Sequence, residues 1–142
     1  MQCMASKTPV LPDAQDANAD RWEAQLRKGT LELAILASLH NQKLYGLEIL
    51  RVLEGDCGLE MLEGTLYLIL NRLRANGLVE SEWITTGSGH PRKYYRLTSS
   101  GETHLQTMGL AWMQFSVRIT DLVAPILRNQ EVRRVHSTSD KH

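Results

Sequence analysis

The sequence predicts a mostly α-helical fold with a small β-hairpin and a long final helix. Apolar residues recur at helical spacing in several segments between residues 30 and 76. From residue 79 to residue 97 the pattern changes to the alternation of strands, interrupted by a glycine-rich tip. From residue 105 onward apolar residues repeat at spacings of three and four. Helices that lead into a short hairpin are typical of a winged helix-turn-helix unit, here followed by a long C-terminal dimerisation helix.

The N-terminal region divides into a tail and a short helix. Residues 1–19 mix proline, aspartate and alanine without periodicity, so we expect a flexible tail. Asp20 and Glu23 have the spacing of a capping box, which predicts a short helix that ends at Gly29. Trp22 on this helix packs either against its own domain or against a dimer mate.

Two further helices should precede the hairpin region. Residues 30–40 are apolar on nearly all sides, which predicts a buried helix. After a turn at residues 41–43, residues 46–54 should form a second helix with Ile49, Leu50 and Leu53 facing inward. We expect residues 55–58 to break the chain, with Cys57 as a small turn residue.

The third helix is predicted over residues 65–76. One of its faces is apolar and consists of Leu66, Ile69, Leu70 and Leu73. Gly77 should end it, because glycine takes the left-handed conformation at a helix C-terminus without a Cβ penalty. The strands follow at residues 79–84 and 92–97, joined by the tip GSGHP. In the second strand Tyr95 and Leu97 should face one way, and Tyr94 and Arg96 the other.

A helix with a polar face beside a basic hairpin is a shape that can read duplex DNA. Residues 64–98 hold five basic and two acidic side chains, in a chain whose formal net charge is +0. The alternative is an ordinary solvated helix and hairpin. On the DNA-binding interpretation the candidate contacts are Thr65, Tyr67, Leu68, Asn71, Arg72, Arg74, His90, Arg92 and Lys93.

These segments resemble the PadR family of winged-helix transcriptional regulators. The resemblance rests on the start Gly64-Thr65-Leu66-Tyr67, the exit Gly77-Leu78 and the run Arg92-Lys93-Tyr94-Tyr95 with Leu97 and Thr98. It covers roughly residues 26–105. The family usually has proline after the tyrosine, and Leu68 stands there, which either alters the start of the helix or leaves an apolar contact on its exposed face. The resemblance implies DNA binding, and in some members release of DNA by phenolic or planar hydrophobic compounds.

The final helix should begin at Ser99, where Ser99 and Glu102 have the spacing of a capping box. Its apolar positions form one seam, namely Leu105, Met108, Trp112, Phe115, Ile119, Leu122 and Ile126. The seam packs either on its own domain or, as we favour, on the same helix of a second chain, with Trp22 as a further dimer contact. Trp112 and Phe115 could also line an effector pocket between subunits. Pro125 should kink or end the helix near residue 124.

The predicted organisation is therefore a tail at 1–19, a winged unit at 20–98, a dimerisation helix at 99–127 and a flexible tail at 128–142. The isoelectric point near 7.0 requires any nucleic-acid contact to be local. No uninterrupted apolar run approaches the length of a membrane span, no secretory signal is evident, and two cysteines do not make a disulfide framework, so a cytoplasmic location is expected.

Enzyme interpretations find no support in the motifs. The five histidines are scattered, and the sequence lacks HExxH, CxxC, P-loop and GxGxxG patterns, so we expect neither catalysis nor a metal or cofactor. The expected function is a homodimeric, sequence-specific DNA-binding regulator, most simply a repressor on an inverted repeat, with a small aromatic effector as a further partner. The alternative is a winged-helix module that contacts proteins and does not read DNA.

Overall fold

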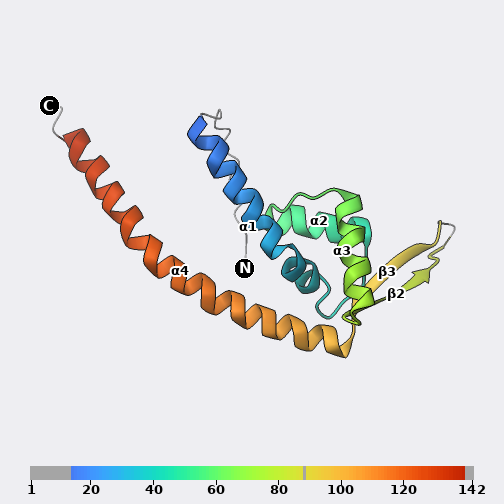
Figure 1. Ribbon diagram of the computed structural model, residues 1–142. Helices are drawn as coiled ribbons and strands as arrows, with labels where there is room; N and C mark the ends of the chain where they lie inside the picture. Colours follow the sequence, from blue (N-terminus) through green and yellow to red (C-terminus); the bar gives the residue numbers. More distant parts are fainter. Residues whose placement is uncertain (1–13, 88, 140–142) are drawn as a thin grey trace. The chain divides into compact units, whose positions relative to one another are not determined.

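The computed structural model describes residues 14–87 and 89–139 of the chain. The chain forms two compact units, of which the first ends at Leu105 and the second begins at Gln106. The helices are α1 (Ala14–Ser38), α2 (Gly46–Cys57), α3 (Glu63–Ala75) and α4 (Ser99–Ser139), and the strands are β1 (Leu44–Tyr45), β2 (Val79–Ile84) and β3 (Arg92–Leu97) (Figure 1). The first turns of α4 thus belong to the first unit.

The strands form one antiparallel sheet with the order β1-β3-β2. In Figure 1 the β2–β3 hairpin follows directly from the C-terminal end of α3. This mostly helical arrangement with a small sheet and a long final helix confirms the predicted fold class. The two-residue strand β1 was not predicted, because it exists only through its pairing with Tyr94 and Tyr95.

The core of the first unit is built from the predicted apolar faces. Its fully buried side chains are Ile35, Leu36 and Leu39 near the end of α1, Ile49 and Leu53 of α2, Leu66, Leu70 and Leu73 of α3, and Val79 and Tyr95 of the sheet. Burying one such side chain contributes about 1.5–3 kcal/mol relative to exposure. This core fixes α3 against α1 and α2 and leaves its opposite face in solvent.

The predicted break at Gly29 is wrong, because α1 is one continuous helix. An internal glycine costs a helix only about 1 kcal/mol. Thr30 follows it and donates its hydroxyl to the Leu26 and Arg27 carbonyls, which satisfies that side chain within the helix. Asp20 and Glu23 lie inside α1 and do not cap its start. Residues 14–19 of the expected tail are helical, and residues 1–13 lie outside the described residues.

Two other helix ends also differ from the predictions. Helix α2 runs past residue 55 to Cys57, and Gly58, which follows it, takes the left-handed conformation with φ 63°. Helix α4 continues through Pro125 to Ser139, so residues 128–139 are helical. Proline removes one hydrogen bond and costs a helix interior about 3 kcal/mol, a cost that several turns on both sides offset.

The cap of α4 is Thr98 and not Ser99. The Thr98 hydroxyl oxygen accepts the Gly101 amide at 3.0 Å, which is the N-cap geometry. The same hydroxyl donates to the Gly77 carbonyl at 2.6 Å, and the Thr98 amide donates to the Leu78 carbonyl at 3.0 Å. Thr98 therefore ties the first turn of α4 to the turn that follows α3.

Helix α4 is long and contains one apolar stretch. Among the described residues it is the one helix that is long and apolar enough to cross a membrane. The apolar stretch of α4 is interrupted by polar residues, so it does not form the uninterrupted apolar run that we looked for in the sequence. Arg118 and Asp121 lie in the same part of α4, and a charge at the centre of a bilayer costs about 2.5–3.5 kcal/mol on insertion scales. Length and composition are thus weak evidence for a span.

Candidate nucleic-acid interface

The exposed face of α3 carries most of the predicted contact residues. Because Leu66, Leu70 and Leu73 point into the core, most positions between them face solvent, whereas Ile69 on the predicted apolar face is half-buried. Asn71, Arg72 and Arg74 are exposed, Leu68 is 73% exposed, and Thr65 is half-buried. The helix begins at Glu63, so Leu68 does not alter its start and instead leaves an apolar side chain on the exposed face.

Tyr67 leans toward α2 and does not project straight outward. A Cβ atom placed on Gly46 would lie 2.6 Å from the Tyr67 hydroxyl oxygen, so the absence of a side chain at Gly46 allows this close approach. Partial burial raises the pKa of Tyr67 above its usual value, and the charge of Glu63 and a hydrogen bond to Glu63 add to this effect. At neutral pH the hydroxyl is therefore protonated and can donate.

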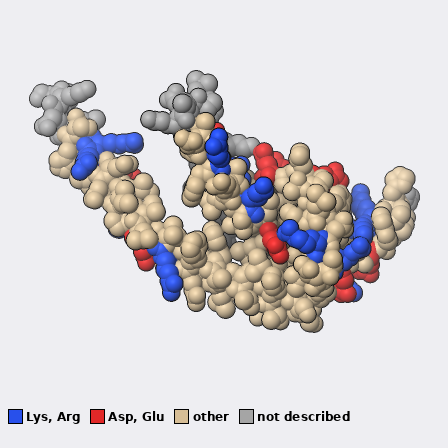
Figure 2. Space-filling view, viewed as in Figure 1, with Lys and Arg blue, Asp and Glu red and all other residues tan. Residues whose placement is uncertain are grey.

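Several cationic side chains near this face are paired with glutamates. Arg72 contacts Glu32 of α1 at 3.3 Å, Arg96 contacts Glu80 at 2.7 Å, and Lys43 contacts Glu82 at 3.5 Å. Figure 2 accordingly shows Lys and Arg interspersed with Asp and Glu over the winged unit. Exposed pairs of this kind contribute only about 0–1 kcal/mol, so a phosphate can replace the glutamate at small cost.

The two cations at the start of β3 lie on opposite faces of the hairpin. The Arg92 guanidinium lies 4.6 Å from the centre of the Tyr45 ring. The Lys93 ammonium lies 6.0 Å from the Trp83 ring and 5.8 Å from the Tyr95 ring. Because successive strand residues alternate between faces, the two charged groups point in different directions, although both side chains border the cavity beside α3. His90 is exposed before the start of β3.

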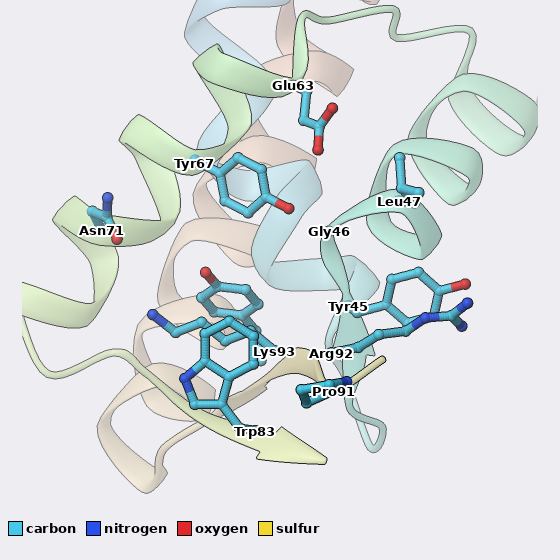
Figure 3. Close-up of a pocket in the computed structure, with 11 residues that line it drawn as sticks. Tyr45, Gly46, Leu47, Glu63, Tyr67, Asn71, Trp83, Pro91, Arg92 and Lys93 are labelled. Carbon is cyan, nitrogen blue, oxygen red and sulfur yellow. The ribbon is translucent and has the colours of Figure 1, made fainter. Parts of the chain in front are cut away.

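A cavity of about 470 Å³ lies between α3, the start of α2 and the hairpin. Its aromatic lining comes from Tyr45, Tyr67, Trp83 and Tyr95, and its charged lining from Glu63, Arg92 and Lys93. Figure 3 shows Glu63 at one end of the cavity, and Trp83 with Lys93 at the other. The predicted contacts included Tyr67, Asn71, Arg92 and Lys93 but missed Trp83 and Tyr45. The alternation of residues along the strand places Trp83 on the same face as Val79, and this pattern could have identified Trp83 as a residue of the site.

The comparisons with known proteins agree with this geometry. Residues 35–107, just over half of the chain, match the transcriptional regulator PadR-like family. The chain belongs to the PadR-like family. A PadR family transcriptional regulator from Eggerthella lenta has a crystal structure with a TM-score of 0.68 and 34% identity, over 78% of this chain and 96% of that one. The crystal structure of a PadR-like regulator from Bacillus cereus has a TM-score of 0.65 and 29% identity, over 70% of this chain and 96% of that one.

A curated relative is also similar to this chain. An uncharacterized protein from Lysinibacillus sphaericus is 29% identical over 89 residues, which is 61% of this chain and 82% of the relative. The PadR-like family is a family of transcriptional regulators. Within the described part of the chain, no group of three or more His, Cys, Asp or Glu side chains is placed to hold a metal ion.

The predicted dimer contacts of this PadR-like chain lie mostly in solvent. Leu105 and Met108 are half-buried, whereas the seam residues beyond them are exposed, namely Trp112 at 39%, Phe115 at 61%, Ile119 at 44% and Leu122 at 70%. Trp22 of α1 is 61% exposed, so it does not pack into its own domain's core. Figure 2 shows the visible face of α4 as largely uncharged. Trp112 and Phe115, the predicted effector contacts, share this exposure.

Proposed function

We propose that this chain is a cytoplasmic, homodimeric repressor of the PadR type that binds an inverted-repeat operator in a sequence-specific manner. The observation that carries the proposal is the exposed polar face of α3 beside a hairpin that holds Arg92 and Lys93 on its two faces. A helix of this size fits the major groove, and cations on the two faces of a hairpin can each meet a different phosphate.

Within this proposal the contact residues have different roles. Asn71 is exposed at the middle of α3, where an amide can pair with the N6 and N7 edge of adenine. Arg72 and Arg74 contact phosphates, and Arg72 gives up its pairing with Glu32 to do so. Thr65, Tyr67, Leu68 and His90 complete the surface as positioning contacts.

The exposed seam of α4 supports the proposed dimerisation through this helix. The repeat is sustained over three heptads, and a single helix cannot bury such a seam alone. A second copy offers the same seam, so two chains can pair around a two-fold axis. The dimer would place its two α3 helices in successive major grooves, about 34 Å apart, and the operator would then be an inverted repeat. Repression follows from occupancy of such a site.

A small planar aromatic effector is proposed to bind where two α4 helices meet, beside Trp112 and Phe115. Both rings are exposed in a single chain, and a second copy would enclose them. Titration with planar aromatics should quench tryptophan fluorescence and release DNA. Because Trp22 and Trp83 also fluoresce, Trp112→Phe is the necessary control. Unchanged quenching and unchanged DNA release in that variant would place the effector elsewhere.

Selection of bound sequences from random duplex DNA tests the central proposal. The expected result is an enriched inverted repeat whose half-sites lie about one helical turn apart. The alternative function is a winged-helix module that contacts proteins, which the glutamate pairing of Arg72 and Arg96 would favour. No enriched sequence, together with no salt-dependent affinity for duplex DNA, would favour that alternative.

A further inference from the structure

Trp83 is a large aromatic side chain that its own chain leaves 68% exposed. On the same face of the sheet, the next residue along β2 is the half-buried Ser81, whose cross-strand partner Tyr95 is buried, and Val79 beyond it is buried as well. Trp83 therefore extends the apolar face of the sheet beyond the core and into the cavity beside α3 (Figure 3). An exposed indole at the mouth of a cavity is typical of a surface that binds a partner, because its ring supplies contact area at low conformational cost.

Lys93 gives this end of the cavity a positive charge. It is the cross-strand partner of Trp83, and its ammonium lies about equally far from the Trp83 and Tyr95 rings. The carboxylate in the cavity lining, Glu63, lies at the other end, where the Tyr67 hydroxyl bonds to it. A ligand at the Trp83 end must therefore carry an anionic group next to an apolar face.

A sugar–phosphate strand of DNA has this chemistry. Its phosphates alternate with deoxyribose rings along the strand, and a strand that borders the major groove must pass between α3 and the hairpin if α3 lies in that groove. We infer that the cavity holds one sugar–phosphate strand of duplex DNA, with the Lys93 ammonium on a phosphate and the Trp83 indole against the adjoining deoxyribose. This inference rests on the proposed DNA-binding function, and it adds a contact that carries no sequence information.

The two side chains should leave different signatures in binding experiments. An indole that packs on deoxyribose displaces no counterions, whereas an ammonium on a phosphate does. With a random-sequence duplex at low salt, Trp83→Ala should weaken binding about tenfold, the loss expected when part of one indole face is no longer covered, and leave the salt slope unchanged. Lys93→Ala should lower the slope by about one unit. Trp83→Phe should recover most of the affinity.

The solvent exposure of the Trp83 indole can be measured on the full-length chain. Protein labelled with 5-fluorotryptophan gives a fluorine resonance for each tryptophan, and Trp83→Phe identifies the resonance of Trp83 by its disappearance. Saturating duplex should reduce the difference in this resonance between H₂O and D₂O, because the ring becomes covered. Thymidine monophosphate at millimolar concentration should not. This measurement holds even if the alanine variant folds poorly.

The outcomes separate the two proposals. If the wild-type chain binds no duplex, the proposed function and this inference both fail. If the wild-type chain binds duplex but Trp83→Ala binds it equally well, or the Trp83 resonance stays solvent-exposed, only this inference fails. If thymidine monophosphate covers Trp83 as well as duplex does, the cavity is a site for small anions and the inference is overturned.

Discussion

The junction between the hairpin and α4 should not tolerate a side chain at Gly101. A Cβ atom built there would overlap the Leu78 carbonyl oxygen and lie 2.9 Å from the Leu78 carbonyl carbon. Neither atom belongs to a flexible side chain, so the backbone must move. That carbonyl accepts the Thr98 amide at 3.0 Å, and the preceding Gly77 carbonyl accepts the Thr98 hydroxyl at 2.6 Å. Relieving the overlap therefore stretches two hydrogen bonds.

The magnitude follows from these contacts. Forced overpacking costs about 1–3 kcal/mol, and each weakened hydrogen bond adds about 0.5–1.5 kcal/mol. The better helix propensity of alanine returns up to about 1 kcal/mol. These terms add to about 1–6 kcal/mol, so we expect Gly101→Ala to lower the free energy of unfolding by about 3 kcal/mol, measured by urea unfolding at fixed protein concentration.

Gly109 provides the matched control in the same helix. A Cβ atom at Gly109 would meet nothing within 4 Å, so Gly109→Ala should raise the free energy of unfolding by about 0.5–1 kcal/mol. If the two variants unfold at the same urea concentration, the close packing of α4 on Leu78 does not stabilise the fold and the reasoning is refuted.

Three further predictions concern DNA binding, assembly and pH. Separate Arg92→Ala and Lys93→Ala substitutions should each lower the salt slope of DNA binding by about one unit, and the double variant should lower it by the sum, because the cations lie on opposite faces. Phe115→Glu with Ile119→Glu should give monomers in sedimentation, since unpaired buried charges cost several kcal/mol. Burial, followed by the charge of Tyr67, raises the pKa of Tyr95 despite an opposing effect of Arg74. The protonated Tyr95 hydroxyl therefore contributes to the free energy of unfolding. This contribution is fully present below about pH 10, the pKa of tyrosine in the unfolded chain, and is lost as the pH rises through the pKa of Tyr95 in the folded chain.

Each of these has an outcome that would contradict it. A strongly non-additive double variant would mean that Arg92 and Lys93 share a phosphate. A double Glu variant that remains dimeric would show that the seam is not the interface, and Thr120→Glu, on another side of the exposed helix, should remain dimeric as a control. Tyr95→Phe should remove part of the alkaline loss of stability, and an unchanged pH profile in this variant would exclude Tyr95 as a cause.

The helix faces could be predicted from the sequence, as could the left-handed Gly77 after α3, whereas several other helix ends could not. Leu66, Leu70 and Leu73 are buried as their spacing predicts, because periodicity is a local property that tertiary structure preserves. The ends depend on a balance that local signals do not decide. Gly29 and Pro125 carry costs of about 1 and 3 kcal/mol, which the flanking turns offset.

The candidate site was only partly predictable for a related reason. The exposed positions of α3 follow from its buried ones, so Asn71 and Arg72 were identified from the sequence. The cross-strand partner of Trp83 depends on the register of the hairpin, which pairs Trp83 with Lys93. The register depends in turn on the length of the hairpin tip, and the alternation of residues along the strands does not determine that length. Tyr45 joins the cavity through β1, which is too short to leave a periodic signal.

The Thr98 junction also limits how an effector could act in the proposed dimer. Thr98 and Gly101 hold the first turn of α4 against the turn after α3. We propose that, in the dimer, an effector between two α4 helices acts by changing the distance between the α3 helices. Moving a population from 99:1 to 1:99 requires a differential affinity of about 5.5 kcal/mol. One planar ring stacked on Trp112 contributes about 0.5–1.5 kcal/mol beyond its area burial. An effector that stacks on Trp112 must therefore also bury apolar surface and make polar contacts, and one that only stacks would release DNA incompletely.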